Sequence, residues 1–154
     1  MLRLLLPLRA PMAAVLMCGA LAACDSSSDD TFDASDYVGT YSGTATVTPA
    51  TGSPTTAPVT ITVATSSGGA ISMTTRVGTD APTTAIGTYT DAGASFVSAG
   101  TPGYNLGISS SGRISGSIRF DAATTATANG TISSSRFDLT LTAPTGTLRY
   151  AATK

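Results

Sequence analysis

From Tyr37 to the C-terminus, apolar and polar residues alternate along the chain with a period of two. In residues 113–120, for example, Ile114, Ile118 and Phe120 fall on one face, while arginines and serines fall on the other. The alternating segments are rich in Thr, Val and Ile, which favour pleated strands. No segment in this part of the sequence repeats apolar residues at helical spacing over three turns. The pattern therefore predicts one all-β domain over residues 37–154.

The connections between the alternating segments are short and rich in Gly, Ser, Asn and Pro. Short connections favour hairpins between neighbouring strands, so we expect an antiparallel up-and-down β-barrel of about eight strands. A β-sandwich is the alternative, because the longest connection, residues 49–58, could be the crossing that a Greek-key sandwich needs. Asn129-Gly130, a pair typical of tight turns, lies within the segment 126–134.

The first alternating segment opens with Gly39-Thr40-Tyr41-Ser42-Gly43. This opening resembles the first strand of lipocalin-like small β-barrels, which often begin with Gly, a spacer and an aromatic residue. Those barrels usually carry Trp there, whereas this chain contains no Trp. The resemblance implies a barrel whose interior can carry or sense a small apolar ligand.

Two functions remain open for such a domain. A ligand carrier needs a cavity of roughly 300 Å³ or more, and the inward-facing residues expected to line it are Tyr41, Val47, Ile61, Ile71, Met73, Leu106, Ile118, Phe120, Leu139 and Tyr150. A filled barrel would instead act through its surface, as a structural or protein-interaction module of the cell envelope. Aromatic residues make up only 6% of the chain, which favours the filled, non-enzymatic module and leaves the carrier as the alternative.

The side chains that most enzymes use are missing. The chain contains no His and no Glu, so Ser-His and Cys-His nucleophile pairs cannot form. We therefore expect no enzymatic activity, no cofactor and no metal site. The net charge of −1 offers no basic field for nucleic acid. Asp138 lies outward beside Arg136, and an exposed ion pair is its simplest role.

The amino terminus resembles a bacterial secretory signal. Arg3 and Arg9 supply positive charge, and residues 10–23 form an apolar stretch that is too short to span a membrane. Leu21-Ala22-Ala23-Cys24 resembles the lipobox of bacterial lipoproteins. The resemblance implies that residues 1–23 are a signal peptide, and that Cys24 receives diacylglycerol and an amino-terminal acyl chain such as palmitate. We thus expect a membrane-anchored lipoprotein of the bacterial cell envelope, whose partner is the membrane through Cys24.

Residues 24–36 follow the expected cleavage site and hold five of the nine acidic residues of the chain. Such a composition predicts a disordered tether between the lipid and the domain. Asp25 directly follows the expected lipidated cysteine and resembles an inner-membrane retention signal of enteric bacteria. Asp25 therefore favours the inner membrane, the outer membrane stays the alternative, and the domain is expected to face the periplasm or the cell exterior.

Overall fold

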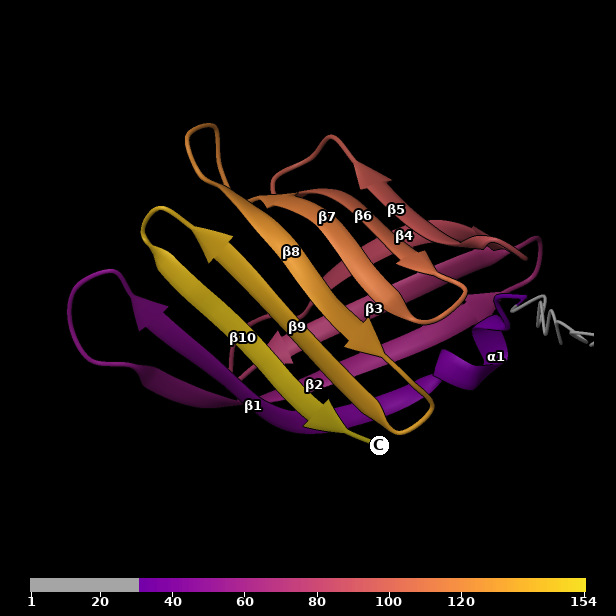
Figure 1. Cartoon of the computed structure of the whole chain (residues 1–154), viewed down its shortest axis with the longest axis horizontal. Helices are drawn as coiled ribbons and strands as arrows, with labels where there is room; N and C mark the ends of the chain where they lie inside the picture. Colours follow the sequence, from indigo (N-terminus) through magenta and orange to yellow (C-terminus); the bar gives the residue numbers. More distant parts are fainter. Residues whose placement is uncertain (1–30) are drawn as a thin grey trace, which may run out of the picture.

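Ten antiparallel strands close into one barrel in the computed structural model, which describes residues 31–154. Every strand pairs with its neighbours in sequence, and β10 pairs with β1 to close the barrel (Figure 1). The elements are α1 (Ala34–Tyr37), β1 (Gly39–Pro49), β2 (Thr55–Ser66), β3 (Ala70–Val77), β4 (Thr83–Thr90), β5 (Gly93–Ser98), β6 (Gly103–Ser109), β7 (Arg113–Arg119), β8 (Thr125–Ile132), β9 (Arg136–Ala143) and β10 (Gly146–Thr153). The predicted up-and-down barrel is confirmed, and the β-sandwich alternative is ruled out.

The strand number is ten rather than about eight because some hairpin turns are very tight. The turns between β4 and β5 and between β9 and β10 consist of residues 91–92 and 144–145, so more strands fit into the same length of chain. The long connection is a hairpin loop, residues 50–54, and not a crossing, because β1 pairs directly with β2.

Asn129-Gly130 makes no turn, contrary to the usual preference of this pair. Both residues lie inside β8, where Gly130 is opposite Leu139 of β9 and Ile114 of β7. A Cβ atom on Gly130 would lie 2.8 Å from the Cα of Leu139. The glycine is therefore needed for the close approach of two strands, a role that a sequence pattern does not distinguish from a turn.

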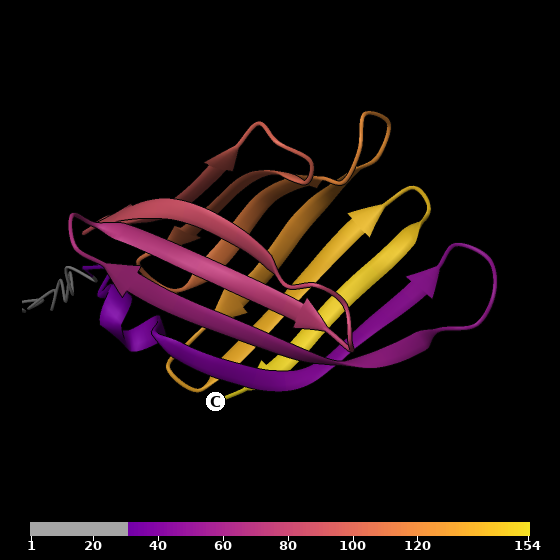
Figure 2. The same ribbon diagram turned by 180° about the vertical axis from the view of Figure 1, so that it is seen from behind.

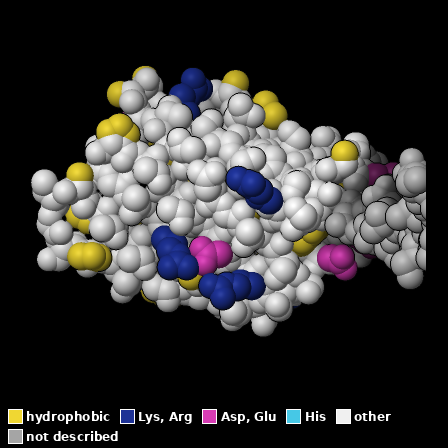
Figure 3. All heavy atoms as spheres, viewed as in Figure 1, with side chains coloured by type: hydrophobic (Ala, Val, Ile, Leu, Met, Phe, Trp, Pro, Cys, Tyr) yellow, Lys and Arg dark blue, Asp and Glu magenta, His cyan; other side chains and the backbone are white. Residues whose placement is uncertain are grey.

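The alternation predicted from the sequence places apolar side chains inside the barrel and Thr and Ser outside. The buried side chains of the described residues are all apolar or aromatic, and none is charged. Charged groups are sparse on the outer face shown in Figure 3. Residues 31–154 thus contain a closed sheet together with its own apolar core, which is what an independently folding domain requires.

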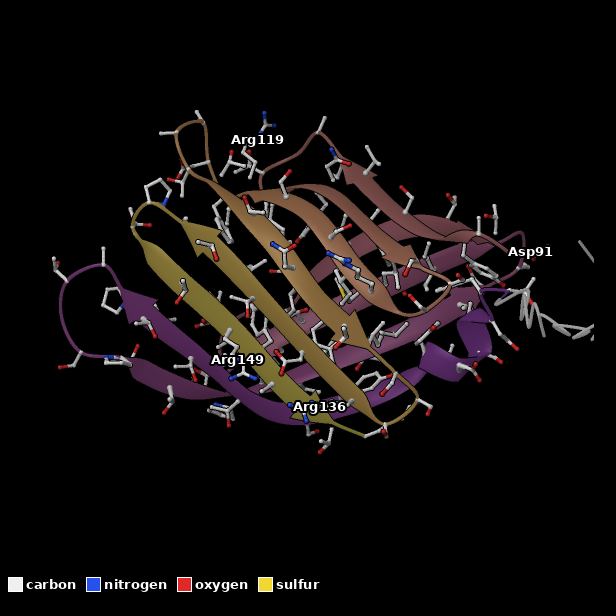
Figure 4. All side chains as sticks on the ribbon, in the orientation of Figure 1. Asp91, Arg119, Arg136 and Arg149 are labelled. Atoms are coloured by element: carbon white, nitrogen blue, oxygen red, sulfur yellow. The ribbon has the colours of Figure 1, made fainter. Side chains whose placement is uncertain are left out.

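The α1 end of the barrel is closed by the segment that precedes β1. Phe32 is only 4% exposed, its ring centroid lies 5.0 Å from that of Tyr37 and 6.3 Å from that of Tyr89, and its N–H donates to the Asp91 carbonyl (2.7 Å). Figure 4 labels Asp91 at this end. The side chain of Asp33 accepts a hydrogen bond from the N–H of Ser35 and caps α1. The closure therefore combines aromatic packing with backbone hydrogen bonds.

The prediction that the tether extends to residue 36 is therefore wrong for its last residues. Burial of Phe32 and Tyr37 offsets the entropy lost on ordering the segment, while Asp33 and Asp36 stay exposed. The signal peptide, Cys24 and the tether over residues 24–30 lie outside the described residues and stay predictions. Within residues 31–154, no helix has the length and apolar character needed to cross a membrane.

Candidate ligand-binding cavity

The end of the barrel opposite α1 contains an apolar cavity of about 330 Å³. Figure 2 shows α1 at one end and the loop joining β1 to β2 at the other. The cavity lies where β3 ends and β4 begins, and its wall extends across the barrel to β9 and β10. Its lining consists of Met73, Thr75, Val77, Asp80, Ala81, Thr83, Ala85, Pro102, Tyr104, Ile118, Phe120, Phe137, Leu139, Leu141 and Tyr150.

The deep wall of the cavity is made by buried apolar side chains that point inward from paired strands. Leu139 and Leu141 of β9 lie on one side, and Met73 of β3 and Ala85 of β4, which are register partners, lie on another. The exposed residues Asp80 and Ala81, in the turn between β3 and β4, lie at the mouth. The cavity thus has an apolar interior and a polar residue at its mouth, which is the usual construction of a small-molecule site.

Two tyrosines supply hydroxyl groups to this apolar interior. Burial raises the pKa of Tyr104, and burial together with the neighbouring Tyr104 raises the pKa of Tyr150 to about 12. Both phenols are therefore protonated at neutral pH. Neither hydroxyl makes a hydrogen bond to another residue within the described range 31–154.

A second hollow of about 190 Å³ lies beside the first at the same end. It is lined by Val47 of β1 and by residues of β8, β9 and β10. Phe120 and Leu141 line both hollows. Phe120 is 40% exposed, so its ring lies at the mouth between the two hollows and is not packed in the core.

Six of the ten residues predicted to line a cavity lie at one of the two hollows. Met73, Ile118, Phe120, Leu139 and Tyr150 line the larger hollow, and Val47 lines the smaller one. The other four pack into the filled half of the barrel near α1 and line neither hollow, namely Tyr41, Ile61, Ile71 and Leu106. Whether any of these residues binds a ligand stays a prediction.

The filled half is fixed by Tyr41, which is fully buried. Its hydroxyl lies 2.9 Å from the carbonyl oxygen of Tyr37 and 2.8 Å from that of Ser133, and donates to them. Its ring centroid is 6.1 Å from that of Phe137. Tyr41 therefore links α1 to the turn between β8 and β9, and its ring fills the barrel interior at this end.

Sequence reasoning missed Tyr104, Phe137 and Leu141 as lining residues. The period-two pattern could have identified them, because Tyr104 lies on the same face of its strand as Leu106, and Phe137 and Leu141 lie on the same face as Leu139. The mouth residues Asp80, Ala81 and Pro102 carried no such signal, since they lie in turns outside the period-two pattern.

The outer face carries an ion-pair cluster that is separate from the cavity. Asp138 accepts hydrogen bonds from Arg149 (2.6 and 3.2 Å) and from Arg136 (3.2 Å). The hydrogen bond from Arg149 is the main cause that holds the pKa of Asp138 below its usual range. Figure 4 places Arg119 apart from this pair, and its guanidinium donates to the Ala99 carbonyl (2.9 Å). The expected surface ion pair is confirmed, and Arg119, Arg136 and Arg149 each have a partner within the barrel.

The described residues 31–154 include no group of three or more His, Cys, Asp or Glu side chains that could hold a metal ion. No family model and no curated protein matches the sequence. The fold is similar to the crystal structure of a protein of unknown function of the DUF3598 family from Nostoc punctiforme, with a TM-score of 0.64 and 12% sequence identity. The match covers 80% of this chain and 49% of that one, so this chain spans about half the length of the protein that it matches. The likeness shows a shared small β-barrel fold.

Proposed function

We propose that this protein is a lipid-anchored, non-enzymatic binding protein of the bacterial cell envelope, which holds a small apolar molecule in its barrel. The observation that carries the proposal is the cavity of about 330 Å³ between Met73, Ala85, Ile118 and Leu139. This volume reaches the range of about 300–1,000 Å³ that is typical of ligand pockets. A filled structural module would have no need of such a space, so the cavity favours the carrier over the module.

The position of the mouth fits an anchored carrier. The described chain enters the barrel at the closed end, where Phe32 is buried, and Cys24 lies eight residues earlier in the sequence. A fully extended chain of that length reaches at most about 29 Å. The anchor therefore joins the domain at the closed end, and the mouth lies at the opposite end, where a ligand can enter from solution.

Binding is tested with N-phenyl-1-naphthylamine, an uncharged fluorophore whose emission rises in apolar surroundings. The protein is the chain from residue 24 onward with Cys24→Ser, which retains the whole described barrel. We expect saturable binding with one site per chain. Ala85→Leu, which extends a side chain into the cavity, weakens binding at least tenfold, whereas Ile86→Ala on the outer face of the same strand leaves it unchanged. Equal affinity in all three proteins would overturn the cavity as the binding site.

The anchor is tested separately in bacterial cells. The unsubstituted chain should incorporate labelled palmitate and partition into the detergent phase, because Leu21-Ala22-Ala23-Cys24 directs acylation. Cys24→Ser should abolish both. Continued partitioning of the substituted chain into detergent would refute the lipoprotein assignment. Sedimentation of the inner and outer membranes then tests the inner-membrane location that Asp25 suggests.

A further inference from the structure

We infer that the cavity selects an uncharged apolar molecule that carries a carbonyl oxygen, and that Tyr104 and Tyr150 donate hydrogen bonds to that oxygen. This inference rests on the proposed function, and it adds the chemical class of the ligand. It follows from three properties of the lining, which concern its hydrogen-bond donors, its charge and its size.

The first property is the pair of tyrosine hydroxyls. Tyr104 comes from β6 and Tyr150 from β10, strands separated in the barrel by β7, β8 and β9, and both side chains reach the same cavity. A tyrosine phenol is already protonated at neutral pH, and burial raises the pKa of both further, so both can act as donors. Neither hydroxyl is hydrogen-bonded to another described residue, so each can donate to an acceptor that a ligand brings. A carbonyl oxygen has two lone pairs, so it can accept from both phenols.

The second property is the charge of the lining. No Arg or Lys lines the cavity, and the one charged residue of its lining is Asp80 at the exposed mouth. An anionic ligand would lose its hydration without gaining a cationic partner, and Asp80 would repel it. A cationic ligand would have only Asp80 as a counter-charge, and Asp80 lies at the mouth, away from the apolar wall. An uncharged ligand avoids both costs.

The third property is size. A volume of about 330 Å³ lies at the lower end of the range of about 300–1,000 Å³ found for small-molecule pockets. Such a space suits a compact molecule of one or two rings or a short chain. Apart from Thr75 and Thr83 on β3 and β4 and Asp80 at the mouth, the remaining wall is made of apolar side chains, which complement a hydrocarbon body. The expected ligand is therefore a small ketone, ester or quinone-like molecule.

The test uses three naphthalene derivatives with the same number of non-hydrogen atoms and similar shapes. They are 2-acetonaphthone, which has the carbonyl oxygen, 2-isopropylnaphthalene, in which a methyl group replaces that oxygen, and 2-naphthoate, which is anionic. Their affinities are measured by displacement of N-phenyl-1-naphthylamine from the Cys24→Ser chain. The proteins compared are this chain and its Tyr104→Phe, Tyr150→Phe and Tyr89→Phe variants. Tyr89 lies at the closed end against Phe32, so Tyr89→Phe is the matched control.

We expect each of Tyr104→Phe and Tyr150→Phe to weaken 2-acetonaphthone binding about threefold to tenfold, the loss of one hydrogen bond. Both variants should leave 2-isopropylnaphthalene binding unchanged. Tyr89→Phe should alter the binding of neither the ketone nor the hydrocarbon. 2-Naphthoate should bind more than tenfold more weakly than the ketone. An equal effect of the tyrosine variants on ketone and hydrocarbon, or tighter binding of the anion, would overturn this inference alone. Failure of all three compounds and of the fluorophore to bind would overturn the proposed function as well.

Discussion

Filling the cavity with a larger side chain should stabilise the barrel, provided that the space is real. Ala85 of β4 is 3% exposed, lies opposite Met73 and lines the cavity. Ala85→Leu adds three carbon atoms that project into this space. Burial contributes about 0.8 kcal/mol per methylene, and ordering a leucine side chain costs about 0.5–1 kcal/mol. The free energy of unfolding should therefore rise by about 1–2 kcal/mol.

The same substitution in the filled part of the barrel is the matched control. Ala128 of β8 is fully buried between Gly116 and Leu141 and lines neither hollow. Ala128→Leu overpacks its surroundings and should lower the free energy of unfolding by about 1–3 kcal/mol. Urea unfolding followed by far-UV circular dichroism measures both changes. Destabilisation of Ala85→Leu by as much as Ala128→Leu would refute the argument, because it would mean that no free space exists beside Ala85.

Three further predictions concern the closed end, the mouth and the tyrosine pair. Phe32→Ala removes a buried ring, so it should lower the free energy of unfolding, measured with urea, by about 3 kcal/mol. A loss below about 0.5 kcal/mol would mean that the segment before α1 does not close the barrel. Phe120→Ala should join the hollows of about 330 and 190 Å³ and let the protein bind a longer ketone such as 2-dodecanone, as measured by fluorophore displacement. An affinity for 2-dodecanone equal to that of the parent chain would mean that Phe120 does not separate the two hollows. The pKa of Tyr150 is raised to about 12 from 10.0, so the stability it contributes is full below pH 10 and is lost as the pH rises towards 12. The free energy of unfolding, measured with urea at pH 9 and at pH 11, should therefore fall less between the two pH values for Tyr150→Phe than for the parent chain. An equal fall in both proteins would contradict the burial of this phenol.

The period-two alternation predicted the barrel and the direction of most side chains. Ile61 and Leu139, for example, were both expected to face inward, and both do. The alternation gives the face of a side chain but not its height along the barrel axis. Ile61 therefore lies in the filled half and Leu139 at the cavity, although their sequence patterns are the same.

The closure of one end of the barrel and the opening of the other come from residues outside the strands. Phe32 and Tyr37 close one end, and they lie within or beside an acidic stretch whose average composition predicts a tether. Composition averages over a segment, whereas a stack of two aromatic rings depends on two positions. The turn residues at the other end leave a mouth, and their side chains carry no periodic signal.

Native mass spectrometry measures most directly whether the barrel carries a ligand. The Cys24→Ser chain is produced in its own host behind a cleavable secretory signal, purified without detergent and sprayed from a volatile buffer. The account predicts an adduct of defined mass, bound once per chain, uncharged in solution and absent from the Ala85→Leu variant. A mass equal to that of the polypeptide alone, persisting after incubation with a lipid and metabolite extract of the host, would contradict it.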